Sequence, residues 1–281
     1  MSALDAKLLR DLARLWAQVG AISLVMAAGV MTLVLTVGAQ RSLFETRAAY
    51  YERNAFADIF AAATRAPESL QGRIAALPGV AAAETRIREN AVLDIEGMAE
   101  PALGILVSVP DDGVEVLNRL HMRAGRLPAP GHPDEVVVNE PFAAAHGFRP
   151  GDTFGAVVNG RKRQLRIVGT ALSPEFIYVV TDLMPDNRRL GVVWMSREAL
   201  AAAFNLKGAF NAVSVRLLRD QPAEPVIDGI DRLLEPYGGR GAHDRDDQQS
   251  HAFLDSELTG LRAMSYVLPP IFLLVSAFLV N

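Results

Sequence analysis

The chain has no cysteine among its 281 residues. Disulfide bonds and cysteine nucleophiles are therefore excluded, and any folded domain must be stabilised by its apolar core. The sequence also lacks the glycine-rich phosphate loop that ends in Lys and Ser or Thr, so the chain does not bind ATP in the Walker manner. No Gly-x-Ser-x-Gly motif occurs, which excludes the hydrolases that place their serine on that turn.

An excess of charge of one sign is missing too. The sequence has 28 Lys and Arg against 32 Asp and Glu, and its one run of three basic residues is 161–163. Nucleic-acid binding needs concentrated positive charge, because much of the affinity comes from neutralising phosphates. We therefore exclude nucleic acid as a partner.

The sequence does contain two long apolar runs. The first lies within residues 15–40, carries no charge and, as a helix, is long enough to cross a hydrocarbon core of about 30 Å. Three basic residues precede it and favour a cytoplasmic N-terminus: Lys7, Arg10 and Arg14. A cleaved signal peptide is the alternative, but this run exceeds the roughly 7 to 15 residues of a signal sequence. We predict a cytoplasmic amphipathic helix over residues 1–17 and a transmembrane helix over residues 18–40.

The second apolar run follows Arg262 and extends to the last residue, Asn281. Pro269 and Pro270 interrupt it, which a membrane helix tolerates when neighbouring segments satisfy the freed carbonyls. The alternative is a buried helix of a soluble domain. We predict that residues 263–281 begin a second transmembrane helix, inside which the chain ends.

Residues 41–262 lie between the two runs and are predicted to form an extracytoplasmic domain. Its roughly 220 residues can bury a sizeable core without disulfides. Helical spacing over residues 42–54 and 248–267 predicts two stalks that lead into the membrane spans. The segments between alternate irregularly between strand and helix patterns, which indicates an α+β class, with two lobes.

The clearest local signal is a hairpin, strands 153–158 and 161–172 around Asn159-Gly160, a dipeptide that suits a type I′ turn. A helix over 142–146 should end at Gly147 in the left-handed conformation. Segment 174–185 and the stretch around Pro222 and Pro225 are predicted as surface connections. Further strands are predicted at 56–63, 91–95 paired with 103–109, 135–139, 192–195 and 212–218, and further helices at 67–77, 197–204 and 226–237.

One segment has the composition of a metal site, with five nitrogen or oxygen ligands close together: His243, Asp244, Asp246, Asp247 and His251. The two histidines are not spaced i, i+4 on a helix, and the segment follows two glycines as a polar connection, so a solvated loop is the better interpretation. His121, His132 and His146 are isolated beside turn residues. We assign no catalytic, cofactor-binding or metal-binding residue, and expect no enzymatic activity.

Residues 123–172 carry a more specific pattern. A Gly-Arg is followed by an acidic pair, a valine-rich strand, a small helix, Gly-x-x-x-Gly-Asp and a hairpin that returns to Val-Gly. The matching positions are Gly125-Arg126, Asp134-Glu135, 136–138, 142–146, 147–152 and Val168-Gly169. This segment resembles the extracytoplasmic core domain of MacB-type and FtsX-like ABC-transporter permeases.

The resemblance implies a multi-pass inner-membrane permease half with a periplasmic domain. Such a half pairs with a second permease copy or half in the lipid bilayer, and a separate cytoplasmic ATP-binding subunit drives it. A periplasmic adaptor protein can assist, and substrates are typically lipids, lipoproteins, peptides or drugs. The family carries at least three more spans after the domain, and this sequence ends before them. The alternative is a membrane-anchored sensor, which has the same layout of an external domain between two spans.

Overall fold

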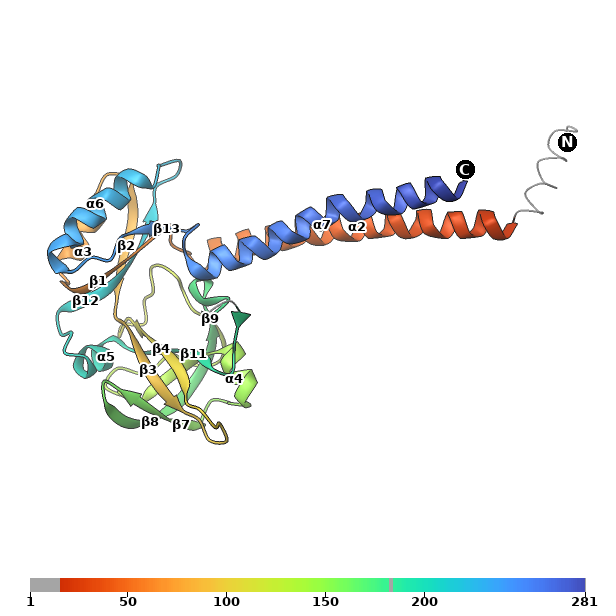
Figure 1. Cartoon of the computed structure of the whole chain (residues 1–281). Coiled ribbons are helices and arrows are strands. Elements are labelled where there is room, and N and C mark those ends of the chain that lie inside the picture. Colours follow the sequence, from red (N-terminus) through yellow and green to blue (C-terminus); the bar gives the residue numbers. More distant parts are fainter. Residues whose placement is uncertain (1–15, 182–183, 281) are drawn as a thin grey trace, which may run out of the picture. The chain divides into compact units, whose positions relative to one another are not determined.

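The computed structural model describes residues 16–181 and 184–280, so most of the amphipathic helix predicted for residues 1–17 lies outside the described part. The chain divides into two compact units (Figure 1). The helical unit takes in the residues up to Ala49 and those from Asp255, and the domain unit is Tyr50–Leu254. The predicted membrane and periplasmic boundaries, 18–40 and 41–262, stay predictions.

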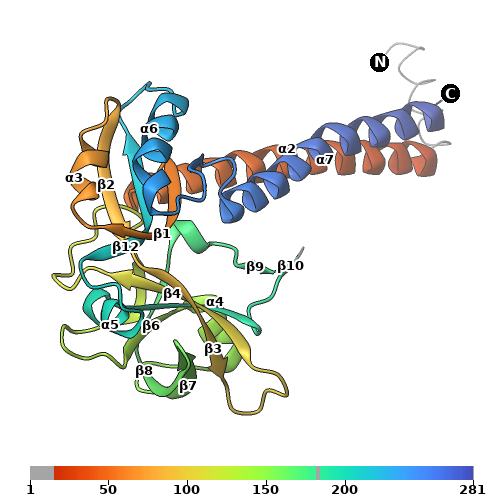
Figure 2. The ribbon, with the colours of Figure 1, turned by 60° about the vertical axis from the view of Figure 1, so that its left-hand side comes forward.

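Two long helices, α2 (Trp16–Arg53) and α7 (Gln249–Val280), supply the helical unit. They run side by side in both views, and Arg47 donates a hydrogen bond of 2.8 Å to Asp255 between them (Figure 1 and Figure 2). Both predicted stalks are thus confirmed as continuous helix. Among the described residues, α2 is the one helix that is long and apolar enough to cross a membrane. The second predicted span, 263–281, is helical through Val280, but its membrane crossing stays a prediction.

The first lobe of the domain unit is a four-stranded antiparallel sheet with two helices on one face (Figure 2). Its strands lie in the order β13 (His243–Asp244), β1 (Ile59–Pro67), β12 (Ala209–Leu217) and β2 (Val80–Arg86). Helices α3 (Leu70–Ala75) and α6 (Glu224–Leu234) pack on this sheet, and η2 (Glu235–Tyr237) follows α6. The apolar core between them includes Ile59, Ile74, Phe210, Val213 and Ile230.

The second lobe is a seven-stranded mixed sheet. Six strands close into a ring, because β7 pairs with β3 on one side and with β8 on the other. The order is β5 (His121–Gly125), β8 (Arg161–Leu172), β6 (Glu135–Asn139), β11 (Leu190–Ser196), β4 (Ala102–Val109), β3 (Arg88–Asp94) and β7 (Thr153–Val158). Short elements complete the lobe: α4 (Glu140–His146), α5 (Arg197–Ala203), η1 (Pro174–Phe176), β9 (Val180–Thr181) and β10 (Met184–Pro185). Its core includes Leu93, Leu106, Phe142, Leu165 and Val193, all fully buried. The predicted α+β class is confirmed.

The predicted hairpin is confirmed with its bounds. Strands β7 and β8 pair antiparallel, with Val158 opposite Arg161. Asn159 and Gly160 have φ values of 45° and 75°, the positive values that a type I′ turn requires. The cap of α4 is also confirmed, because Gly147 adopts a left-handed φ of 70°.

Both predicted surface connections are wrong in part. Pro174, Glu175 and Phe176 are buried, because the Phe176 ring packs edge-on against Trp194 with ring centroids 6.2 Å apart. Pro225 lies in the first turn of α6, where its missing N–H would have had no partner in the helix. Proline alone therefore did not distinguish an exposed connection from a buried turn or a helix start.

Candidate functional site

One continuous strand path joins the two lobes. Strand β2 of the four-stranded sheet ends at Arg86, and β3 of the seven-stranded sheet begins at Arg88. The residue between them, Ile87, is fully buried, and its N–H donates to the Ser108 hydroxyl at 2.9 Å. The sequence pattern predicts a single strand at 91–95 in this region. Two strands are present instead, because the chain changes sheets at Ile87.

A buried charged cluster, here called the joint cluster, lies beside this crossing. It consists of Glu84, Arg86, Glu115, Asn118 and Glu175. Arg86 donates to Glu84 at 3.0 Å and has ion-pair contacts of 4.0 Å with Glu115 and with Glu175. The cluster therefore gathers side chains from β2, from the segment between β4 and β5, and from η1.

Backbone groups complete the joint cluster. The second oxygen of Glu84 accepts from the N–H groups of Val116 and Leu117 at 2.8 and 2.6 Å. Arg86 donates in turn to the Leu117 carbonyl at 2.5 Å. The segment that follows β4 is thus fastened to β2 by hydrogen bonds to charged groups, which are stronger than neutral ones.

Asn118 links the most segments of all. It is completely buried and has a φ of 48°, a left-handed conformation that asparagine tolerates better than most residues. Its Nδ2 donates to Glu175 at 3.0 Å and to Ser214 at 3.1 Å, while its Oδ1 accepts from the N–H of Ala57 at 2.8 Å. One side chain therefore connects β12, η1 and the residues that lead into β1.

The joint cluster holds three carboxyl groups and one guanidinium. Burial would by itself lower the pKa of Arg86, but Glu84, Glu175 and Glu115 together raise it, so the guanidinium stays charged. Burial raises the pKa of the Glu115 carboxyl, although Arg86 opposes that shift. Within the described residues, Glu115 Oε1 and Arg86 Nη1 have no hydrogen-bond partner. Ionised Glu115 is thus the least satisfied member of the cluster.

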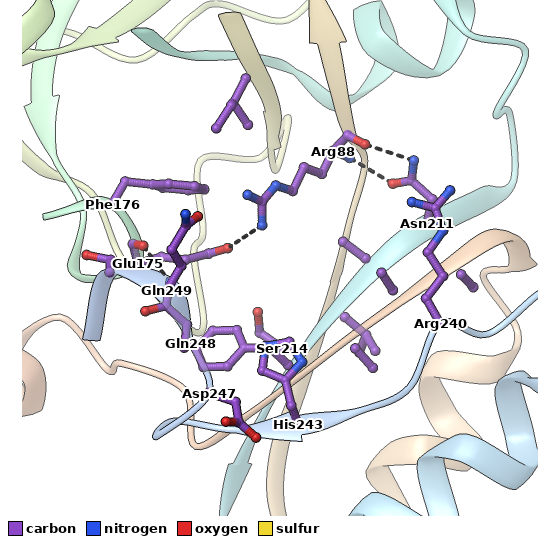
Figure 3. Close-up of a pocket in the computed structure, with 18 of the residues that line it drawn as sticks. Arg88, Glu175, Phe176, Asn211, Ser214, Arg240, His243, Asp247, Gln248 and Gln249 are labelled. Carbon is purple, nitrogen blue, oxygen red and sulfur yellow. Dashed lines mark hydrogen bonds and ion pairs between the residues drawn. The ribbon is translucent and has the colours of Figure 1, made fainter. Parts of the chain in front are cut away.

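A cavity of about 720 Å³ opens next to the joint cluster and between the two lobes (Figure 3). Small side chains of the four-stranded sheet, Ala62 and Ala212, leave room at one wall. The opposite lobe contributes Arg88, Ile105 and Phe176. Residues between α6 and the first turn of α7, including β13, add further lining: Arg240, His243, Asp247, Gln248, Gln249 and Ser250.

The ends of both long helices that belong to the domain unit are anchored near this cavity. The Tyr51 hydroxyl, in the last turn of α2, lies 3.1 Å from Nδ1 of His251 in the first turns of α7. Gln248 donates to the Glu175 carbonyl at 2.8 Å, and the Ser250 hydroxyl accepts from the Tyr178 N–H at 3.0 Å. The start of α7 is therefore bonded to the same part of the domain as the joint cluster, and the end of α2 is bonded to the start of α7.

The residues that carry the family resemblance lie together and act structurally. Arg126 contacts Glu135 through two hydrogen bonds of 2.7 and 2.8 Å, and Arg166 adds a third of 2.6 Å. Hydrogen bonds from Arg126, from the Ala129 N–H and from Arg166 lower the pKa of Glu135 to about 2, against an opposing effect of burial.

Two glycines of the same pattern allow close backbone packing. A Cβ on Gly125 would lie 2.1 Å from the Val168 carbonyl, and one on Gly169 would lie 2.6 Å from the Arg126 carbonyl. Strands β5 and β8 pair at this point, where Gly125 is opposite Gly169. Side chains here would separate the two strands, which explains why the pattern needs glycine.

The candidate metal ligands have other contacts. His243 stacks on Phe60 with ring centroids 6.0 Å apart, and His251 contacts Tyr51 as described above. Asp244 accepts from the Asp246 N–H at 2.9 Å. The described residues contain no group of three His, Cys, Asp or Glu that could hold a metal ion.

Sequence reasoning missed the joint cluster. The signal available was a strand, residues 80–86, whose alternate positions carry Glu84 and Arg86 on the face opposite the apolar core. Charged residues at such spacing ordinarily indicate a solvent-exposed face. Their partners come from distant segments, so no local pattern showed that the face is covered.

No protein-family model matches the chain, and no curated protein matches it either. Among solved structures, the chain is similar to the periplasmic region of MacB from Actinobacillus actinomycetemcomitans, with 10% identity and a TM-score of 0.44 over 74% of this chain and 95% of that one. It is similar to the extracellular domain of the ABC-type transporter YknZ from Gram-positive bacteria, with 12% identity and a TM-score of 0.43 over 67% of this chain and 98% of that one. A domain of a protein assigned as a permease in Porphyromonas gingivalis shares 13% identity, with a TM-score of 0.35 over 68% of this chain and 90% of that one. These similarities are too distant to assign a family.

Proposed function

We propose that this chain is part of an ABC-transporter permease, in which a separate cytoplasmic subunit hydrolyses ATP and the domain unit moves in response. In this proposal α2 crosses the inner membrane, the apolar part of α7 begins a second span, and Tyr50–Leu254 lies in the periplasm. The partners are the ATP-binding subunit, a second permease copy or half, the lipid bilayer and, in some assemblies, a periplasmic adaptor. The cargo is a lipid, lipoprotein, peptide or drug.

The observation that carries the proposal is the anchoring of both long helices in the domain. Tyr51 at the end of α2 contacts His251 at the start of α7, and Gln248 bonds to η1 beside the joint cluster. An α-helix transmits axial displacement well while its hydrogen-bond ladder is intact. A shift of either helix end would therefore act first on the contacts that hold the two lobes together.

The sequence resemblance supports the same proposal. Its residues form one connected piece of the seven-stranded lobe, in which Arg126 pairs with Glu135 and the glycines permit the close approach of β5 and β8. These contacts explain the pattern by folding rather than by catalysis. A pattern of that kind marks a shared scaffold, and function must be tested separately.

A sensor remains the second candidate, and the cavity between the lobes is the observation that favours it. A cavity of about 720 Å³ is large enough for a small ligand, as in many receptors. The two candidates differ in the partner in the cytoplasm. A permease binds an ATP-binding subunit, whereas a sensor binds a kinase or a methyl-accepting module.

The first experiment tests partner and topology. The tagged chain is purified from its native membranes in mild detergent, and an ATP-binding subunit with a Walker motif should co-purify in stoichiometric amount. Because the chain has no cysteine, single cysteines can be placed at will. A membrane-impermeant maleimide should label Lys207→Cys in spheroplasts and Ser2→Cys only after lysis. Co-purification of a kinase instead would favour the sensor.

The second experiment tests transmission through α7. Spin labels at Ala75→Cys on α3 and Gln164→Cys on β8, both exposed, report the distance between the lobes. ATP should change this distance in the assembled complex. Glu257→Pro should abolish the change, because an interior proline removes a hydrogen bond and disrupts the helix at a cost of about 3 kcal/mol. Leu258→Ala, which trims one buried side chain, should retain it. An unchanged response in assembled Glu257→Pro would contradict transmission through this helix.

A further inference from the structure

Arg88 lines the cavity, and its guanidinium is ion-paired with Glu175 but forms no hydrogen bond among the described residues. Its backbone is fixed by Asn211, whose Oδ1 accepts from the Arg88 N–H at 2.7 Å and whose Nδ2 donates to the Arg88 carbonyl at 2.9 Å. The guanidinium lies 5.2 Å from the centre of the Phe176 ring and 3.7 Å from the nearest Glu175 oxygen (Figure 3). The second distance is too long for a hydrogen bond. The backbone is thus held in place by hydrogen bonds, while the guanidinium has one long ion pair and no hydrogen bond among the described residues.

A second arginine lines the same cavity from the other lobe. Arg240 lies in the segment before β13, and its N–H donates to the Ala62 carbonyl at 2.9 Å. Its side chain is exposed and forms no hydrogen bond or ion pair within the described residues. Two positively charged groups that form no side-chain hydrogen bond among the described residues therefore line one cavity, Arg88 from the seven-stranded lobe and Arg240 from the segment before β13.

The remaining charged groups of the lining are largely engaged or lie elsewhere. Glu89 accepts from Asn211 at 2.9 Å, and burial raises its pKa although Arg240 and Asn211 oppose the shift. Glu175 accepts from Asn118 and has ion-pair contacts with Arg88 at 3.7 Å and with Arg86 at 4.0 Å. Asp247 lies away from Arg88 in Figure 3. His243 stacks on Phe60. These acidic groups would repel a ligand that carries several negative charges, so the cavity suits a ligand with one anionic end.

We propose that the cavity binds a polar organic molecule through a single carboxylate or phosphate group, which Arg88 and Arg240 hold. A guanidinium donates two parallel hydrogen bonds to either group. The volume of about 720 Å³ is within the range of small-molecule sites. Arg88 belongs to the seven-stranded lobe and Arg240 to the four-stranded lobe, so a bound molecule would also bridge them. This inference does not depend on the transport assignment, because binding is measured directly.

The test uses the full chain in detergent with three probes: inorganic phosphate, N-acetyl-dialanine with a free carboxylate, and the same dipeptide as its C-terminal amide. Isothermal calorimetry measures binding, and the melting temperature reports stabilisation. Phosphate or the free carboxylate should bind and raise the melting temperature, whereas the amide should not. Binding of phosphate alone identifies a phosphate ester as the natural class, and binding of the carboxylate alone identifies an organic acid.

Variants locate the site. Arg240→Gln removes one exposed guanidinium and should weaken binding at least about tenfold, the effect of losing a charged hydrogen-bonding pair. Arg88→Lys keeps a positive charge but loses the two-pronged geometry, and should also weaken binding. Arg219→Gln removes an exposed arginine outside the lining and should leave binding within about twofold. If neither anionic probe binds, or if Arg240→Gln binds as the wild type does, the proposal is wrong.

Discussion

The two lobes and the joint between them bury different kinds of side chain. Each lobe has a core of aliphatic and aromatic side chains, such as Ile74 and Phe210 in one and Leu106 and Phe142 in the other. The joint instead buries three glutamates around Arg86, with hydrogen bonds from neighbouring backbone groups.

Because of this difference, the cores stabilise each lobe, whereas the joint fixes how the two lobes are arranged. Apolar burial is strong and non-directional, so it stabilises a lobe without fixing how that lobe meets its neighbour. Hydrogen bonds and ion pairs have narrow geometry, and a buried charge without its partner is costly. The joint therefore holds one arrangement of the lobes, and a ligand or a helix displacement that offers alternative partners can change it.

We expect Arg86→Met to lower the free energy of unfolding more than the other substitutions. The substitution leaves three buried carboxyl groups without their cation, which typically costs about 3–5 kcal/mol of unfolding free energy. The cost should shrink as the pH falls, because burial raises the pKa of the Glu115 carboxyl and a protonated Glu115 no longer needs the cation. Urea unfolding of the full chain in detergent at pH 7 and pH 4.5 measures both values. Arg219→Met is the matched control and should cost almost nothing. Equal free energies of unfolding for the two variants at pH 7 would show that the joint cluster does not depend on the Arg86 charge.

A substitution in the apolar core should destabilise the chain without a dependence on pH. Leu106 is fully buried in the seven-stranded lobe, and Leu106→Ala should cost about 2–5 kcal/mol through lost apolar contacts and the cavity left behind. No ionisable group is involved, so the cost should be the same at pH 7 and pH 4.5. If the cost of Leu106→Ala depended strongly on pH, the core and the joint would not differ in this respect, contrary to our expectation.

A substitution in the hairpin turn, which lies outside the cores and the joint, should lower the unfolding free energy by a smaller amount. Gly160 has a φ of 75°, and a Cβ added there would meet no other atom within 4 Å, so only backbone strain opposes substitution. Gly160→Val should cost on the order of 1 kcal/mol or more, because β-branched residues disfavour positive φ. Gly72→Ala, in α3 and in open space, is the control and should not destabilise the chain. The measurement is the same urea unfolding curve.

Two glutamates should show opposite and smaller pH effects. The pKa of Glu135 is lowered to about 2 in the folded chain, so its stabilisation is present above the ordinary value of 4.5 and is lost as the pH falls toward 2. Glu135→Gln should therefore destabilise at pH 7 and converge with wild type near pH 2. The pKa of Glu115 is raised, so its ionisation costs stability as the pH rises above the ordinary value of 4.5. Glu115→Gln should stabilise at pH 7, with no gain below pH 4. A reversed sign for either residue would contradict the assigned environments.

Sequence patterns predicted the elements whose signals are local. The turn at Asn159-Gly160, the cap at Gly147 and the strand at 135–139 each depend on residues within one short segment. The switch of sheets at Ile87 was missed because it interrupts the alternation by which strands are recognised. The burial of η1 was missed because it depends on Trp194, which lies in the distant strand β11.

The candidate site was beyond the reach of sequence patterns for the same reason. Arg86 is separated in sequence from Glu115 and Glu175, and nothing near any of them marks it as buried. Arg88 and Arg240 likewise meet one cavity from distant positions. Only the pairing of Arg126 with Glu135 was within reach, because the resemblance placed both residues in one motif.

Whether the joint cluster holds the two lobes in place is tested most directly by the distance between the lobes when Arg86 is replaced. Spin labels at Ala75→Cys on the four-stranded lobe and Gln164→Cys on the seven-stranded lobe report this distance by pulsed electron paramagnetic resonance. In the otherwise wild-type chain we expect one narrow distribution of distances, and in Arg86→Met, under conditions where each lobe remains folded, a broad or shifted one. Leu106→Val, a mild change in the core, should keep the narrow distribution. An identical narrow distribution in folded Arg86→Met would show that the joint cluster does not hold the lobes in place.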